Sequence, residues 1–280
     1  MIKWLAFAAA TFFLCFPLQA EVKPFVEFWN QGAYYATNVE RNNFSSLLGR
    51  YEGKVGINPF ESQILQVYGV YYGTASQSND YWDNSLYYGL GVRSKPFEKY
   101  IGKGWADEWF RDVRYFMETL APIYFKDAIS GEANKRFDNR YGLDLWHEWN
   151  LDNPDYNNYW GEVWSNLSYR ATNFGYDDFN GYLFYFQPKV GRHLGRGIEP
   201  YVKIDYTTST KNDYWLNMAN YGAGIRFEPW RATEKRDDFL LKFKMFAEIL
   251  KVNYLKDVPS DPNKVITKDV KFGVEFSMGR

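Results

Sequence analysis

Two histidines are the first residues in this sequence that could do chemistry. His147 is followed by Glu148-Trp149-Asn150, which lacks the second histidine of a zinc-protease helix. His193 lies in a predicted polar turn, where a polar side chain needs no special role. We expect both to be interface polar residues, and we predict no catalytic residue, metal site, cofactor or enzymatic activity.

Residues 1–20 have the pattern of a secretory signal peptide. Lys3 precedes an apolar run from Trp4 to Leu18, and small Ala20 follows, after which we expect cleavage. The run is shorter than the ~20 residues that a membrane-spanning helix needs. The single cysteine, Cys15, lies within this segment, so the mature chain is expected to have no disulfide and no thiolate site.

Charge is nearly balanced, and aromatic residues are abundant. The chain has 33 basic and 34 acidic residues, which gives no indication of a nucleic-acid partner. It has 11 Trp, 24 Tyr and 23 Phe, or 21% of all residues, yet it is hydrophilic on average. This combination is typical of a transmembrane β-barrel, which has aromatic girdles at both interfaces and a polar lumen.

Apolar and charged residues alternate with a period of two in many segments of the sequence, which indicates that β-strands position the charged side chains. At the C-terminal end, Val270, Phe272 and Val274 alternate with Lys271 and Glu275. One face of such a strand suits lipid and the other suits water. Twelve segments are predicted as strands, an even number as single-chain outer-membrane barrels require: 25–35, 44–56, 63–74, 81–93, 109–121, 139–149, 160–172, 181–191, 199–208, 214–227, 239–253 and 268–278.

The sequence also contains an internal repeat. Residues 79–97 read NDYWDNSLYYGLGVRSKPF, and residues 212–230 read NDYWLNMANYGAGIRFEPW. A unit this long holds several elements, in contrast to the ~20 to 50 residue period of solenoids. We therefore predict an all-β barrel over residues 21–280, built from two six-strand units at about 25–149 and 160–280.

The alternation places many charges on the inward face of the predicted barrel. Because charges inside need partners or water, two interpretations stay open: a channel, and a lumen closed by ion pairs. The predicted inward residues are Glu27, Glu52, Lys54, Arg93, Asp112, Arg114, Glu118, Arg140, Asp144, Glu148, Glu162, Arg170, Lys189, Arg226, Lys242, Lys244, Glu248, Lys271 and Glu275. Of these, the candidate pore lining is Arg93, Asp112, Arg114, Glu118, Glu162, Arg170, Arg226, Lys242, Lys244 and Glu248.

Arg93 and Arg226 occupy equivalent places in the two units. Each follows a Gly-x-Gly, and the missing side chains of Gly89 and Gly91, and of Gly222 and Gly224, are predicted to open space on the inward face. Equivalent positions of two six-strand halves lie roughly opposite each other in a barrel. We therefore expect these arginines to face each other as a cationic constriction.

The C-terminal segment resembles the sorting signal of outer-membrane barrels. It contains a polar residue, a glycine and two spaced hydrophobic residues, namely Lys271, Gly273, Phe276 and Met278. Such chains usually end on the last aromatic residue, whereas this one continues with two more residues. We expect recognition by the barrel-assembly machinery and contact with outer-membrane lipid.

Three runs resemble a known family. Residues 141–150 (YGLDLWHEWN), 160–164 (WGEVW) and 170–174 (RATNF) look like the C-terminal barrel of bacterial phage-adsorption protein A, a family similar in role to exopolysaccharide-export barrels. The resemblance implies an outer-membrane barrel that handles polysaccharide. The family's periplasmic helical-repeat domain has no counterpart here, so a separate periplasmic partner protein is the expectation for an export role.

The sequence thus predicts an outer-membrane channel for a hydrophilic solute, with polysaccharide export as the finer hypothesis. The second interpretation is a non-conducting surface barrel that acts as a receptor or structural partner. A lipid-modifying barrel enzyme is the least favoured, because the histidines are poorly placed for acid–base catalysis.

Overall fold

The structure is a computed structural model, and it describes most of the chain. The described residues are 22–37, 45–60, 64–78, 83–98, 104–126, 137–151, 158–172, 180–195, 197–229, 243–260 and 265–278. The predicted signal peptide (1–20) and the candidate lumen residue Lys242 lie outside them.

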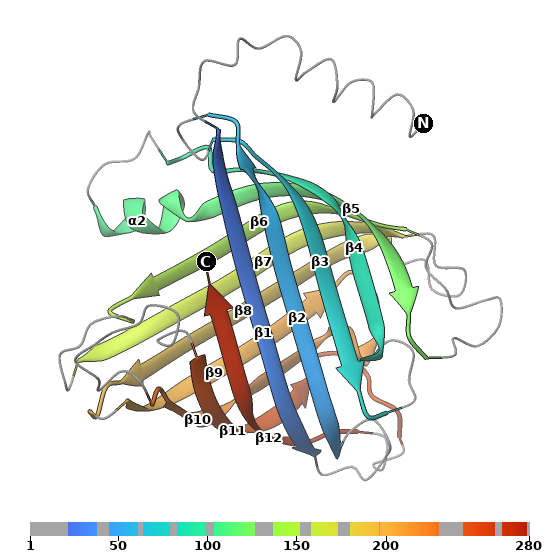
Figure 1. Cartoon of the computed structure of the whole chain (residues 1–280). Coiled ribbons are helices and arrows are strands. Elements are labelled where there is room, and N and C mark those ends of the chain that lie inside the picture. Colours follow the sequence, from blue (N-terminus) through green and yellow to red (C-terminus); the bar gives the residue numbers. More distant parts are fainter. Residues whose placement is uncertain are drawn as a thin grey trace.

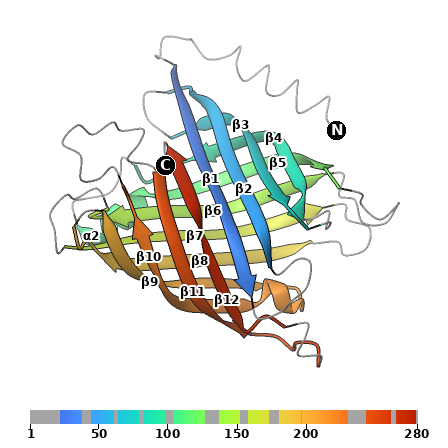
Figure 2. The ribbon, with the colours of Figure 1, turned by 60° about the horizontal axis from the view of Figure 1, so that its bottom comes forward.

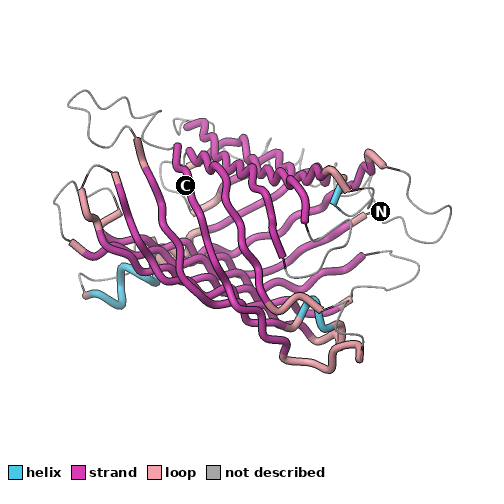
Figure 3. Tube along the Cα trace, turned by 90° about the horizontal axis from the view of Figure 1, so that it is seen from below, coloured by secondary structure: helices cyan, strands magenta, loops and turns pink. Residues whose placement is uncertain are grey.

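The chain folds into a closed barrel of twelve antiparallel strands, each paired with its sequence neighbours (Figure 1). The strands are strongly tilted and form nearly the whole of the wall, as two further views show (Figure 2, Figure 3). The predicted fold class, a transmembrane antiparallel β-barrel, is confirmed. The strands are β1 (Lys23–Thr37), β2 (Ser45–Asn58), β3 (Gln66–Ser76), β4 (Ser85–Ser94), β5 (Val113–Tyr124), β6 (Asp138–Trp149), β7 (Tyr159–Thr172), β8 (Gly181–Arg192), β9 (Ile198–Ser209), β10 (Met218–Phe227), β11 (Phe243–Tyr254) and β12 (Lys268–Met278).

The barrel closes where the first strand meets the last. β1 pairs with β12 over ten residues, including Gln31 opposite Glu275. Gly273 makes this contact close, because a Cβ there would overlap the carbonyl oxygen of Gly32. Closure leaves no unpaired strand edge, which a barrel in lipid requires.

Side chains alternate between the two faces of the wall in the predicted phase. On β5, Tyr115 and Met117 are exposed on the outside, whereas Arg114 and Glu118 are buried inside. On β11, Met245 and Ile249 are exposed, and Lys244 and Glu248 are buried. Charges therefore gather in the interior and apolar groups on the outer surface, as the alternation of a membrane barrel demands.

Two of the predicted strands begin later than the alternation predicts, because a short helix occupies their first residues. Residues Trp105–Arg111 form helix α2, so the predicted strand from 109 begins only at Val113. Residues Tyr214–Leu216 form the 3₁₀ helix η2 before β10. Within the described part of the chain, no helix is long and apolar enough to cross a membrane.

Helix α2 lies outside the barrel, beside the start of β5 (Figure 1). The Trp109 ring packs against His147, with ring centroids 4.3 Å apart. His147 points away from the lumen, because its neighbour Trp146 lines the interior. The helix therefore covers a patch of the outward face of β6.

Candidate functional site

The first group of interior charges is organised around Arg93. Its two terminal nitrogens donate to Glu27 at 2.9 and 2.6 Å, and its Nε donates to Gln66 at 2.7 Å. Arg93 is 2% exposed. Such a two-pronged bond to a carboxylate fixes the guanidinium in one position against its own wall.

Glu118 is the acceptor at the centre of the same group. It receives hydrogen bonds from the Tyr68 hydroxyl at 3.0 Å and the Tyr72 hydroxyl at 2.8 Å. The ammonium of Lys54 lies 3.8 Å away. Arg114 lies 4.0 Å from both Glu27 and Asp144, which adds Asp144 of β6 to the carboxylates around Arg93. We call this set, together with Arg140 and its partner Asp138, the first network.

A second network occupies the other half of the barrel. The Nε of Arg226 donates to Glu199 at 2.7 Å, and Glu162 lies 3.5 Å from the same guanidinium. Glu162 is also paired with Lys189. The second network further contains Glu228 beside Arg226, and Glu248, which binds the Tyr201 hydroxyl at 2.7 Å, Lys203 at 3.1 Å and Lys271 at 3.5 Å.

The ion pairs of each network stay within one half of the barrel. Those between described residues join partners within β1–β6 or within β7–β12, including the segments that directly flank these strands. In the first half they connect strands as far apart as β1 and β5. In the second half they connect β12 with β9. Hydrogen bonds link the halves, because the Trp164 indole of β7 donates to Asp144 of β6 and Gln31 of β1 donates to Glu275 of β12. Each network therefore stiffens its own half of the wall around the interior space.

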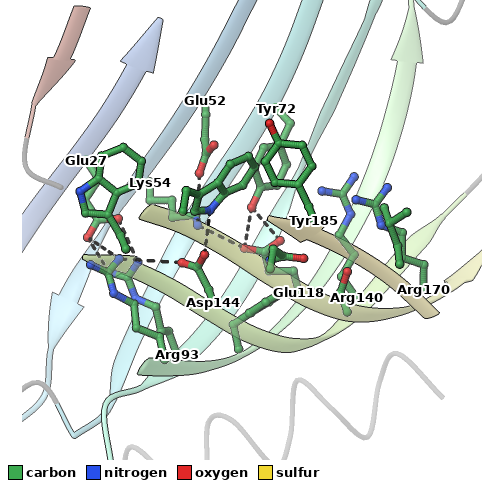
Figure 4. A pocket seen from close by; sticks show the side chains of 17 residues that line it. Glu27, Glu52, Lys54, Tyr72, Arg93, Glu118, Arg140, Asp144, Arg170 and Tyr185 are labelled. Carbon is green, nitrogen blue, oxygen red and sulfur yellow. Dashed lines mark hydrogen bonds and ion pairs between the residues drawn. The ribbon is translucent and has the colours of Figure 1, made fainter. Parts of the chain in front are cut away.

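That space contains cavities in the described part of the lumen. The first cavity has a volume of about 210 Å³ and lies between β1–β6 on one side and β7–β8 on the other (Figure 4). Two more have volumes of about 290 Å³ and 280 Å³. Trp146 and Trp164 line the first two cavities, and Tyr185 lines all three. The cavities therefore follow one another along the lumen and share walls.

The predicted pore-lining residues fall on these walls with three exceptions. Arg93, Arg114, Glu118 and Arg170 line the first cavity. Arg226, Lys244 and Glu248 line the second. The exceptions are Glu162, which is buried and pairs with Arg226, Asp112, and Lys242, which lies outside the described residues.

Asp112 lies outside β5, at the end of α2, and lines none of the three cavities. Its carboxylate bonds to Nδ1 of His147 at 2.8 Å, on the outward side of the wall. The predicted inward position assumed that the strand already runs at this residue, but α2 turns the chain there. The His147 ring is buried and packs with Trp109 and Trp149 in a three-ring cluster.

Arg93 and Arg226 are not brought together. They line different cavities, and carboxylates hold each guanidinium on its own wall. The prediction that neighbouring glycines open space is wrong. The Tyr68 ring covers Gly91, and the Tyr201 ring lies 2.6 Å from where a Cβ of Gly224 would stand.

The residues of the predicted assembly signal all lie on β12. Lys271 points inward, 3.4 Å from Asp269 and 3.5 Å from Glu248. Phe276 and Met278 are opposite Asn30 and Phe28 of β1 in the closing strand pair. The signal therefore coincides with the seam of the barrel.

Sequence reasoning missed several lumen residues that strand parity could have found. Arg50 has the parity of inward Glu52 and lines the second and third cavities. Trp146 and Trp164 have the parity of Asp144 and Glu162. The Trp164 indole donates to Asp144 at 3.0 Å, and its ring centroid lies 4.4 Å from that of Tyr185.

His193 serves the fold. Its Nδ1 bonds to Glu199 at 2.6 Å and its Nε2 to the carbonyl oxygen of Asn150 at 2.9 Å. Both ring nitrogens are thus occupied. Within the described ranges, no three His, Cys, Asp or Glu side chains form a group that could hold a metal ion.

Comparisons with known proteins give remote structural likenesses only. No protein-family model and no curated protein matches the sequence, so the resemblance to the phage-adsorption barrel gains no support from either. Among solved structures, the COG4313 outer membrane channel from Pseudomonas putida F1 has a TM-score of 0.41 and 9% identity, over 94% of this chain and 97% of that one.

Two further solved structures are similarly remote. A loop-deletion mutant of OmpT, an outer membrane protein of Vibrio cholerae, has a TM-score of 0.39 and 7% identity, over 92% of this chain and 99% of that one. The KdgM porin has a TM-score of 0.35 and 8% identity, over 90% of this chain and 99% of that one. The assignment of the fold rests on the strand pairing of this chain itself.

Proposed function

We propose that this protein is an outer-membrane channel for a hydrophilic solute. The observation that carries the proposal is the series of wall-sharing cavities along the lumen, which the ion pairs of the two networks leave unfilled. Twelve strands also enclose more space than the eight whose side chains just fill a barrel.

The solute that fits this lumen best is a saccharide chain, and polysaccharide export is the finer form of the proposal. Trp146, Trp164 and Tyr185 place aromatic rings along the shared walls, between charged and hydrogen-bonding groups. Sugars present apolar C–H faces and a rim of hydroxyls. Rings for the faces and polar groups for the rim are the two features that such a ligand requires.

The proposal includes the location and the partners. Insertion through the barrel-assembly machinery would use the β12 residues Lys271, Gly273, Phe276 and Met278, and an export role would require a separate periplasmic partner protein. Outer-membrane fractionation and heat-modifiable gel mobility test the location. Recovery as a soluble periplasmic protein would contradict it.

We also propose that the barrel arose by duplication of a six-strand unit. The contacts Tyr68–Glu118 and Tyr201–Glu248 support this, because equivalent positions of the repeat make the same hydrogen bond. To test this, residues 21–149 are expressed alone. Assembly of two such chains into one barrel would show that a single unit carries the folding information.

Planar bilayer recording of the purified barrel tests the channel. We expect discrete single-channel steps in salt, and block of these steps when a soluble oligosaccharide is added. A barrel that inserts, shown by heat-modifiable mobility, but passes no current would favour the non-conducting receptor. The observation that keeps this second candidate is the confinement of the lumen to cavities of about 210 to 290 Å³.

A further inference from the structure

Arg140 and Arg170 stand directly opposite each other on β6 and β7 and line the first cavity. Their side chains lie side by side in Figure 4. Two like charges in a cross-strand pair destabilise a sheet unless something compensates them. The pair therefore needs a source of negative charge.

Among the described residues, every cation of this cavity but one has a carboxylate within ion-pair distance. Lys54 has Glu52 at 3.3 Å, Arg93 has Glu27 at 2.6 Å, and Arg114 has Glu27 and Asp144 at 4.0 Å. Arg140 has Asp138 at 2.9 Å. For Arg170, no carboxylate among the described residues lies within the 4.0 Å limit of an ion pair.

Arg170 also lacks a hydrogen-bond acceptor for one of its nitrogens. The Nε of Arg170 is buried and has no hydrogen-bond partner within the protein. The Nε of Arg114 and the hydroxyl of Ser168, on the walls of the same cavity, are in the same condition. A buried polar group without a partner destabilises the fold, and a charged one does so more strongly. These three donors lie on the walls of one cavity, so a ligand with acceptor oxygens would satisfy them.

Aromatic rings complete the surroundings of the arginine pair. The Arg140 guanidinium lies 4.7 Å from the ring centroid of Tyr72 and 5.8 Å from that of Tyr87. The bond to Asp138 and these rings hold Arg140 in place, while the Nε of Arg170 has no acceptor within the protein. Planar guanidinium groups bind carboxylate and phosphate oxygens with two parallel hydrogen bonds.

We infer that Arg170, with Arg140 beside it, forms an oxyanion subsite that binds the acidic group of a charged saccharide. This inference rests on the proposed function, because it specifies the hydrophilic solute of that channel as an acidic saccharide. The Tyr72 ring beside Arg140 would receive a sugar face, and the Trp164 ring, farther along β7 in the same cavity wall, would receive the next.

Isothermal titration of the purified barrel in detergent tests the subsite. The titrants are trigalacturonate, neutral maltotriose and inorganic phosphate. We expect trigalacturonate to bind, maltotriose to bind at least tenfold more weakly, and phosphate to compete with trigalacturonate. Phosphate binding equal to that of trigalacturonate would show that the subsite takes a free oxyanion and would overturn the saccharide part of the inference.

Three variants locate the binding. Arg170→Gln should weaken trigalacturonate binding at least tenfold, and Arg170→Lys, which keeps the charge, should lose less. Arg192→Gln removes the same charge from an exposed position at the end of β8 and should leave the affinity within twofold. Equal losses in Arg170→Gln and Arg192→Gln would reduce the effect to net charge and overturn the subsite.

This titration does not depend on ion flow. Binding by a barrel that passes no current would refute the channel and keep the subsite. A conducting barrel that binds trigalacturonate and maltotriose equally would keep the channel and refute the subsite. Heat-modifiable mobility of each variant confirms that the barrel is folded before titration.

Discussion

The Nε of Arg226 donates a 2.7 Å hydrogen bond to Glu199, which precedes it by 27 residues. Arg93 makes the same bond, also at 2.7 Å, to Gln66 at the equivalent place. The geometry recurs although the acceptor is a carboxylate in one half and an amide in the other. The second half can hold the extra carboxylate because His193 also bonds to Glu199.

Loss of the Arg226 guanidinium should destabilise the barrel more than loss of Arg93. Arg226→Ala would leave Glu162, Glu199 and Glu228 buried without this cation, a change that costs about 3–5 kcal/mol when one partner of a buried pair is removed. Arg93→Ala would remove this cation from one carboxylate, Glu27, which keeps Arg114 at 4.0 Å. Urea unfolding of the refolded barrel measures both, and wild-type midpoints for both would contradict the structural role of the arginines.

The alternation in the sequence was sufficient to predict the closed barrel, its strand number and the inward face. The phase of β12, for instance, follows directly from apolar residues at even positions and Lys271 and Glu275 at odd ones. Alternation could not predict α2. The residues 109–111 fit either state, and the packing of Trp109 on His147, which belongs to another strand, accompanies the helix.

The ion-pair partners of the lumen residues were harder to predict than the inward or outward direction of their side chains. Glu27 and Arg93 are 66 residues apart and belong to β1 and β4, so their bond depends on the tilt and stagger of four strands. The same limit explains the glycines. Parity shows that Gly91 faces inward, but the shape of the curved wall decides that the Tyr68 ring fills the space above it.

Gly224→Ala should destabilise the barrel by about 1–3 kcal/mol, because the new Cβ would stand 2.6 Å from the Tyr201 ring. Displacing that ring would also disturb its hydroxyl bond to Glu248. Combining the change with Tyr201→Ala, which removes the ring, should give a loss smaller than the sum of the two single losses. Additive losses in urea unfolding would show that the ring and the glycine do not interact.

Phe272→Arg should impair assembly, since Phe272 is 54% exposed on the outward face of β12. A cation among acyl chains costs up to ~2–4 kcal/mol at the bilayer midplane and less near the interface. Glu275→Gln, on the inward face of the same strand, is the control and should assemble normally. The measure is the heat-modifiable fraction in membranes, and equal yields for both variants would mean that the lipid-facing side is misassigned.

Trp164→Ala should widen the lumen where the first two cavities meet. The indole bonds to Asp144 at 3.0 Å and packs 4.4 Å from Tyr185, and its removal would merge the spaces on either side. Because conductance depends on the narrowest section, we expect a roughly twofold rise in single-channel current in planar bilayers. Trp164→Phe, with a smaller ring and no indole N–H, should lie between the wild type and the alanine variant.

Trp215→Ala is the matched control for this change. Trp215 belongs to η2 and is 52% exposed, so its loss removes the same side chain from outside the lumen. Its conductance should equal that of the wild type. If Trp164→Ala folds and inserts but conducts like the wild type, Trp164 does not limit the current. The narrowest section must then lie at other residues of the cavity walls. Substitutions of Arg93 and Arg226, which belong to the two ion-pair networks, would test these residues next.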